Sequence, residues 1–276
     1  MLVTESINQI ISDLFGGDGK DAIAAGLGCD SSSGNALPSV GDFKYEDACF
    51  LVNLLWRDRF AFFTLCERRM LPGLSALLFA LYGIMTLSEI NEPAKPWSQL
   101  QELFLRAYLT ATFQDQHILA WITINTSILM KDHGIQNATI SDDTDARKLV
   151  DAYARSISTL EFSRGTISWY MLRTSTVLFY WIADMLRYNL LDLVPITVRT
   201  GLERLWREFD QDAEYHVYGD MGDHFRMYST SVFRMMENVL RVLDAKHQGM
   251  LAKTMLDVDV YGLIGRILMM ITREGP

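Results

Sequence analysis

The stretch MLPGLSALLFALYGIMTLS, residues 70–88, decides the fold class of this 276-residue chain. It lies between Arg69 and Glu89, holds nineteen residues without a formal charge, and is mostly apolar. A helix that is apolar on every side has to be enclosed, either by other helices or by lipid. We therefore expect residues 70–88 to form the central helix of an all-α bundle. A membrane-inserting segment is the alternative that the same residues leave open.

Helical periodicity dominates the rest of the chain, and no run of alternating strands joined by hairpin turns is found. Pro72 suits the first position of a helix, Ser98 and Thr200 each begin a capping-box pattern, and Pro195 would end a helix. We predict nine to ten helices, with a single all-α domain over residues 42–276. The predicted helices cover residues 3–15, 43–70, 72–90, 98–113, 116–131, 142–162, 166–193, 200–215, 223–246 and 250–271.

A short amphipathic helix is predicted at the start of the chain, over residues 1–15. Its apolar stripe consists of Val3, Ile7, Ile10 and Leu14, at steps of four, three and four residues. A Gly/Ser-rich linker follows over residues 16–41, and a flexible chain of this length reaches about 30 Å. The arm is therefore expected to dock either on its own core or on a neighbouring copy.

The net charge of −9 is distributed unevenly. Residues 1–146 hold 9 Lys and Arg against 18 Asp and Glu, whereas residues 147–276 hold 16 of each kind. Arg outnumbers Lys by 18 to 7, and its planar fork suits carboxylates, phosphates and protein interfaces. Either these arginines pair with carboxylates of the same chain, or the acidic half of one copy faces the Arg-bearing half of another.

The composition indicates a globular protein. The chain has 49% apolar and 21% charged residues, a mean hydropathy of +0.08, and enough length to bury a sizeable core. Its three cysteines, Cys29, Cys49 and Cys66, match no metal-binding spacing, and no signal peptide is recognised. We therefore expect reduced thiols and a cytoplasmic location.

Two clusters of carboxylates are candidate metal ligands. Asp142 and Asp143 form the first, and Asp220 and Asp223 join His224 in the second. Such clusters could serve a magnesium-dependent helical enzyme acting on an apolar, isoprenoid-like substrate, but their spacing fits that chemistry poorly. Capping and the helix dipole explain carboxylates in a first helical turn without a metal. No nucleophile motif or phosphate-loop spacing is present. We therefore assign no catalytic residue, metal or cofactor, and expect a protein that is not an enzyme.

Arginines and aromatic residues alternate over residues 155–188. A groove that binds single-stranded nucleic acid combines guanidinium groups for phosphates with rings for base stacking. The same residues would serve equally well as core aromatics with surface arginine partners, and the negative net charge favours that second reading. The candidate nucleic-acid contacts are Arg155, Arg164, Trp169, Arg173 and Arg187.

A heptad stripe is the clearest interaction signal in the sequence. In the helix predicted after Asp223, it contains Tyr228, Val232, Met235 and Val239, at steps of four, three and four residues. Its partner is either another helix of the same fold or the N-terminal arm of the same chain or a second one. We predict a non-enzymatic protein that acts through protein–protein contacts, most simply as a self-assembling structural component. Nucleic acid is an alternative partner, and a membrane is a less favoured one.

Overall fold

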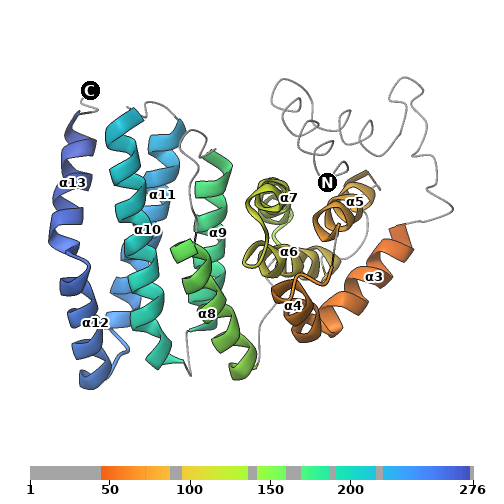
Figure 1. Ribbon diagram of the computed structural model, residues 1–276, viewed down its shortest axis with the longest axis horizontal. Coiled ribbons are helices and arrows are strands. Elements are labelled where there is room, and N and C mark those ends of the chain that lie inside the picture. The colour runs from red at the N-terminus through yellow and green to blue at the C-terminus, as the bar shows by residue number, and fades with distance from the viewer. Residues whose placement is uncertain are drawn as a thin grey trace. The chain divides into compact units, whose positions relative to one another are not determined.

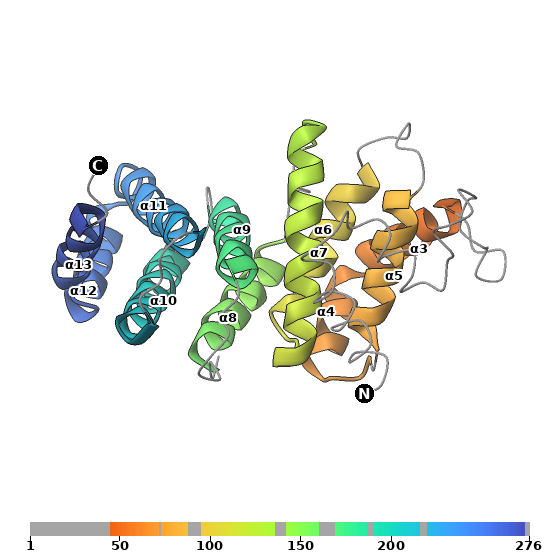
Figure 2. The same ribbon diagram turned by 90° about the horizontal axis from the view of Figure 1, so that it is seen from above.

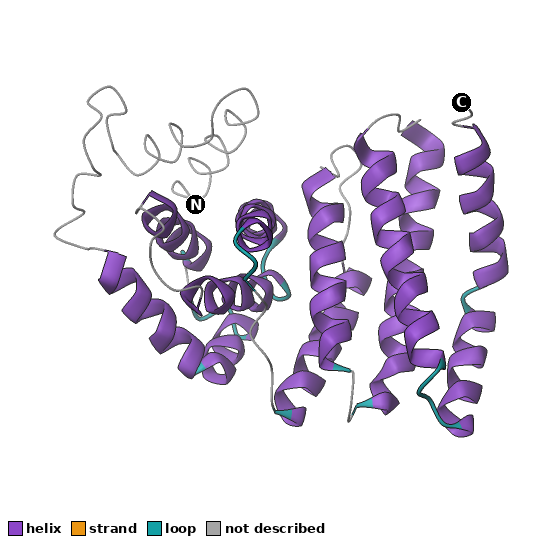
Figure 3. Cartoon of the chain, turned by 180° about the vertical axis from the view of Figure 1, so that it is seen from behind, coloured by secondary structure: helices purple, strands orange, loops and turns teal. Residues whose placement is uncertain are grey.

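The computed structural model describes residues 45–71, 73–87, 95–135, 142–159, 169–186, 190–215 and 220–273. Within these ranges every regular element is a helix, as the sequence predicts (Figures 1 and 3). The α-helices are α3 (Tyr45–Arg57), α4 (Arg59–Glu67), α5 (Leu74–Leu87), α6 (Lys95–Tyr108), α7 (Phe113–Asp132), α8 (Asp143–Thr159), α9 (Trp169–Met185), α10 (Val194–Tyr215), α11 (Asp220–Leu240), α12 (Ala245–Asp257) and α13 (Val260–Arg273), with a 3-10 turn, η3 (Leu191–Leu193), before α10. The predicted arm and linker, residues 1–41, lie outside the described residues.

The chain divides into two compact units, Met1–Ala138 and Thr139–Pro276. α3 to α7 belong to the first unit, and α8 to α13 belong to the second. Because each unit has its own buried core, the uncharged stretch at residues 70–88 organises only the first of them. The single domain over residues 42–276 stays a prediction.

Two helices that the sequence predicts as continuous are each divided. The first breaks at Asp58, between α3 and α4. The second breaks at Val258 and Asp259, between α12 and α13, where Asp259 has a positive φ of 51°. The Asp259 carboxylate then accepts a hydrogen bond from the Gly262 N–H at 3.1 Å and caps the start of α13. The apolar pattern continues across both breaks, so periodicity alone does not reveal them.

Both predicted capping boxes are wrong, because each helix begins at least one turn earlier. Ser98 and Gln101 are buried inside α6, where the Gln101 amide donates to the Ser127 hydroxyl at 2.8 Å. Thr200 lies in α10 and donates to the Ile196 carbonyl at 2.8 Å. Pro195, expected to end a helix, lies in the first turn of α10, where a missing N–H costs nothing.

In the first unit, α5 packs against α3 and α7. Leu78 and Met85 are fully buried, and the Tyr82 ring meets the edges of the Trp97 and Trp121 rings at 6.3 and 5.7 Å between centroids. α5 has 14 residues. Of the described helices, none combines the length and the apolarity needed to cross a lipid bilayer.

A buried charge cluster joins α3, α4 and α6 in the same unit. Glu102 accepts hydrogen bonds from the Arg106 guanidinium at 2.7 and 2.9 Å and from the Trp56 indole N–H at 2.6 Å. The Arg59 guanidinium lies 3.4 Å from the same carboxylate and 4.7 Å from the Trp56 ring centroid. Glu102 and Arg106 are both excluded from solvent, so each depends on the other for its charge balance.

The second unit is built around α9, α10 and α11. α9 packs along α11, α10 packs on α8 and α11, and α12 lies beside α10, as Figures 1 and 2 both show. Gly201 of α10 permits this close packing, because a Cβ at its position would lie 3.0 Å from the Phe179 ring and 3.2 Å from Val232. The centre of the unit also contains a pair of tyrosines, Tyr153 and Tyr228, whose hydroxyl oxygens lie 3.3 Å apart.

Candidate protein-binding site

The heptad stripe of α11 is used inside the second unit. Tyr228 and Val232 are fully buried, Met235 is buried, and Val239 is half-buried. α9 covers much of this face, and its Phe179 ring meets the Tyr228 ring edge-to-face at 6.0 Å between centroids. α10 and α8 also contact it, through Gly201 beside Val232 and Tyr153 beside Tyr228. The partner within the same fold, one of the two alternatives from the sequence, is therefore the one observed.

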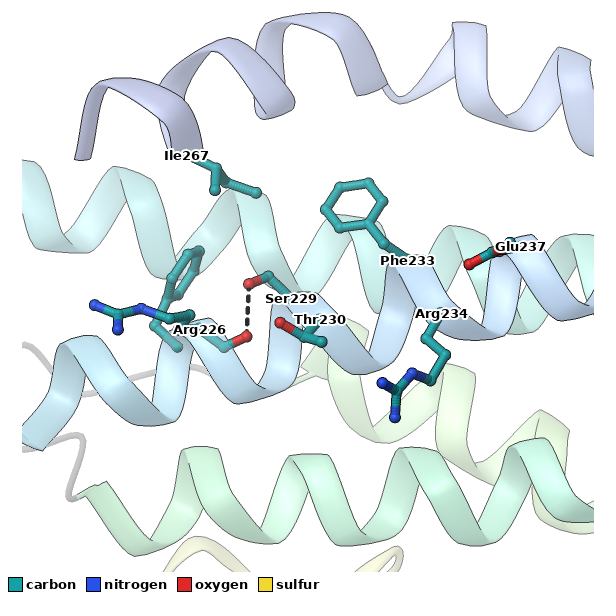
Figure 4. A pocket seen from close by; sticks show the side chains of 8 residues that line it. Arg226, Ser229, Thr230, Phe233, Arg234, Glu237 and Ile267 are labelled. Atoms are coloured by element: carbon teal, nitrogen blue, oxygen red, sulfur yellow. Dashed lines mark hydrogen bonds between the residues drawn. The ribbon is translucent and has the colours of Figure 1, made fainter. Parts of the chain in front are cut away.

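A different face of α11 borders a groove of about 370 Å³ between α11 and α13. Its apolar wall is formed by Phe225 and Phe233 of α11 and by Ile267 of α13. Figure 4 shows the Phe233 and Ile267 side chains directed toward one another across the gap, with Ser229 and Thr230 on α11 below them. The Ser229 hydroxyl donates to the Arg226 carbonyl at 3.0 Å, so its hydrogen is already engaged.

Two arginines dominate the charged margin of the groove. Arg226 and Arg234 are exposed, and their guanidinium groups extend away from the gap between the apolar side chains (Figure 4). Glu237 also lies at this margin, but it pairs with Arg241 at 2.6 Å. Two arginines and one glutamate therefore line this margin.

An exposed apolar face on α13 adjoins the groove. Tyr261, Leu268 and Met269 remain 74%, 56% and 58% exposed, and Ile264 remains 37% exposed. Ile264 lies three residues before the groove-lining Ile267, and Leu268 lies four residues after Ile264, so these side chains share one side of the helix. Apolar patches of this kind commonly mark protein–protein interaction sites.

The metal candidates of the first cluster lie at the start of α8, where Asp142 caps the helix. Asp142 accepts a hydrogen bond from the Thr144 N–H at 2.8 Å, and Asp143 is exposed in the first turn of α8. α11 begins at Asp220, so Asp223 lies within its first turn. The side chains of Asp220, Asp223 and His224 are not described. Among the residues that are described, no cluster of His, Cys, Asp or Glu could hold a metal.

The described residues place only two of the nucleic-acid candidates in full. Arg155 is exposed on α8, and Arg173 is half-buried on α9. Trp169 begins α9, and its side chain is not described. Arg164 and Arg187 lie outside the described residues, as do the arm residues Val3, Ile7, Ile10 and Leu14.

The apolar face of α13 corresponds to a periodic pattern in the sequence. Val260, Leu263 and Ile267 advance by three and four residues, and they form the inward face of α13. Tyr261, Ile264 and Leu268 repeat the same steps one residue later. Two parallel stripes indicate a helix with two apolar neighbours, one of which would lie outside the fold. Comparison of the chain with protein-family models, curated proteins and solved structures finds no match.

Proposed function

We propose that this protein is a non-enzymatic, self-assembling structural component whose copies bind one another through α13 and the groove beside it. The observation that carries this proposal is the apolar face formed by Tyr261, Ile264 and Leu268, with Met269 also exposed on the same helix. Side chains of this size are normally withdrawn from water, and here four of them lie together on one terminal helix.

The size of this face limits what it can do by itself. Covering the exposed parts of the four side chains would contribute about 3 to 7 kcal/mol, from the transfer energy of apolar side chains. Bringing two proteins together costs roughly 4 to 15 kcal/mol in lost translational and rotational freedom. A stable assembly therefore needs additional contact area, and the adjoining groove supplies a second apolar surface.

The direct test compares two isoleucines of equal exposure in the second unit. Ile264 lies on the proposed face and Ile196 lies on α10, and each is 37% exposed. Ile264→Glu would place a charge in the contact between copies, whereas Ile196→Glu adds the same charge elsewhere. Size-exclusion chromatography with light scattering, without detergent, would give the mass of each protein, and absorbance at 260 and 280 nm would detect bound nucleic acid.

We expect an oligomer of defined mass for the unmodified chain and for Ile196→Glu, and a smaller species for Ile264→Glu with unchanged helical content. A monomer at every concentration would contradict self-assembly. An oligomer that Ile264→Glu leaves intact would show that copies meet elsewhere. A high 260 nm absorbance that disappears at high salt would instead favour a nucleic-acid-coating protein.

A further inference from the structure

We infer that α13 pairs with the α13 of a second copy in an antiparallel arrangement, with Leu268 of each copy packed against Gly265 of the other. The inference rests on the proposed self-assembly, and it names the contact and its symmetry. α13 lies at the edge of the second unit (Figures 1 and 2). Its inner side is buried at Val260 and Leu263, whereas its opposite side is exposed.

The first argument is the position of Gly265. It lies four residues after Tyr261 and three residues before Leu268, so it occupies the middle of the exposed apolar face. A Cβ at Gly265 would meet nothing within 4 Å, so no neighbour within the described chain requires a glycine here. A glycine inside a helix lowers helix stability relative to alanine. What it provides is a hollow between the larger side chains of the face.

The second argument is the fit between two such faces. When two helices pair, a side chain of one inserts into a hole that four residues of the other enclose. Tyr261, Ile264, Gly265 and Leu268 stand at i, i+3, i+4 and i+7 and enclose such a hole. Gly265 makes this hole deep, because it has no side chain. Leu268 of the second copy is the knob that enters it.

The antiparallel direction follows from matching large side chains with small ones, as close packing requires. A two-fold axis beside residues 266–267 places Gly265 level with Leu268 of the second copy, and Ile264 level with its Met269. In a parallel pair Gly265 would face Gly265 and Leu268 would face Leu268, which leaves a void at one level and crowds the other. The antiparallel contact uses the same patch on both copies, so it closes after two of them.

The third argument is charge. The chain has a net charge of −9, and a large net charge keeps identical chains apart. Between Val260 and Ile271, however, Arg266 is the one residue with a formal charge. Its guanidinium lies over the Trp206 ring of α10, at 4.8 Å from the ring centroid. Two copies of the exposed face therefore meet without bringing like charges together.

The fourth argument is the apolar surface that a second copy supplies. A second copy brings the same side chains that it covers, so one contact withdraws two sets of Tyr261, Ile264, Leu268 and Met269 from water. Two single helices still bury less than the roughly 1,600 Å² of a standard stable interface. We therefore expect a dimer that dissociates on dilution.

The test replaces two exposed helical glycines in the full-length chain. Gly265→Gln fills the hollow, whereas Gly249→Gln places the same side chain on α12, near Lys246 and Lys253. Both glycines have open space around the Cβ position, and glutamine is the better helix former. Circular dichroism should therefore show full helical content for both variants.

The measured quantity is the dissociation constant of the dimer, from sedimentation equilibrium over a range of concentrations. We expect Gly265→Gln to raise this constant by about tenfold or more, because an inserted side chain overpacks the contact. Gly249→Gln should leave the constant within about twofold, as surface substitutions away from a contact do.

A disulfide experiment tests the direction of the pair. In the antiparallel pair, the two copies of Gly265 are about 4.5 Å apart along the helix axes, whereas the two copies of Tyr261 are about 16 Å apart. Chains with Cys29→Ser and Cys49→Ala retain Cys66, which is buried. In these chains, oxidation by copper–phenanthroline should link Gly265→Cys into a covalent dimer and leave Tyr261→Cys unlinked.

Each further outcome would overturn the inference. A dissociation constant that Ile264→Glu raises and Gly265→Gln leaves unchanged would keep self-assembly through α13 and exclude this pairing. Equal rises for Gly265→Gln and Gly249→Gln would show that the hollow has no special role. Covalent dimers from Tyr261→Cys would indicate a parallel pair. A chain that is monomeric at every concentration would contradict the proposed function itself.

Discussion

The buried carboxylate of Glu102 allows a quantitative test of how the first unit is stabilised. Glu102→Gln removes its charge but keeps an oxygen that can accept from the Trp56 indole. The buried Arg106 guanidinium and the Arg59 guanidinium would then both face a neutral amide in place of the Glu102 carboxylate. Breaking a buried ion pair by changing one partner costs about 3 to 5 kcal/mol. We expect a loss of this size in the free energy of unfolding.

The chain contains a matched control in the pair of Glu237 and Arg241. This pair has the same i, i+4 spacing and a similar distance of 2.6 Å, but both side chains are largely exposed. Exposed pairs of this spacing contribute roughly 0.5 kcal/mol or less, so Glu237→Gln should change stability little. The comparison therefore isolates the effect of burial.

Urea unfolding, followed by far-UV circular dichroism and tryptophan fluorescence, would measure both variants. With a urea dependence of about 2 to 3 kcal/mol per molar for a chain of this size, the midpoint should fall by about 1 to 2 M for Glu102→Gln. The double variant Glu102→Leu with Arg106→Met should lose less free energy of unfolding than Glu102→Gln alone, because it removes both charges of the buried pair. Equal small losses in Glu102→Gln and Glu237→Gln would refute the reasoning.

Three further predictions concern the packing and titration of single residues. Gly201→Ala should lower the free energy of unfolding by about 1 to 3 kcal/mol, because the added methyl would lie 3.0 Å from the Phe179 ring of α9. Gly249 has open space around it, so Gly249→Ala should not lower the free energy of unfolding. Equal losses for the two variants in thermal unfolding would contradict this packing argument. Burial raises the pKa of the Cys66 thiol to about 12, so a maleimide should label Cys66 at pH 8 only after denaturant is added; rapid labelling of the native chain, detected by mass spectrometry, would contradict this. The His247 backbone N–H lowers the pKa of Asp244 below its ordinary value of 3.8. The stability that this cap adds is therefore complete above pH 3.8 and is lost as the pH falls through the lowered pKa of the folded chain. The difference in Tm between the unmodified chain and Asp244→Ala should shrink in acid, and a constant difference would refute the role of Asp244 as a cap.

The helical class could be predicted from the sequence because its signals are local and repeated. The stripe at Tyr228 and Val232 follows helical spacing, and the structure buries it. The helix ends were harder to predict. Asp259 begins a helix in the middle of an apolar run, and Thr200 resembles a cap although α10 starts at Val194. Such ends depend on which competing cap gains tertiary contacts, and spacing alone does not contain that information.

The candidate site was predictable only in part. Exposed apolar residues on α13 repeat at helical intervals, so Ile264 and Leu268 could have been identified as a second stripe. The groove could not, because it depends on how far α11 and α13 diverge. Glu102 and Arg106 also show why burial is hard to predict: four residues apart, they resemble a surface pair, and only the packing of α3 and α4 over α6 encloses them.

The two buried hydroxyl groups at the centre of the second unit have a consequence for the evolution of this chain. Tyr153 and Tyr228 lie on α8 and α11, and their oxygens are 3.3 Å apart. Burial raises the pKa of Tyr153 well above 10, so this phenol stays protonated in the folded chain. Replacing one by phenylalanine removes this hydrogen bond from the other buried phenol, whereas replacing both removes the requirement for it. Related sequences should therefore carry two tyrosines or two phenylalanines at these positions, and mixed pairs should be rare.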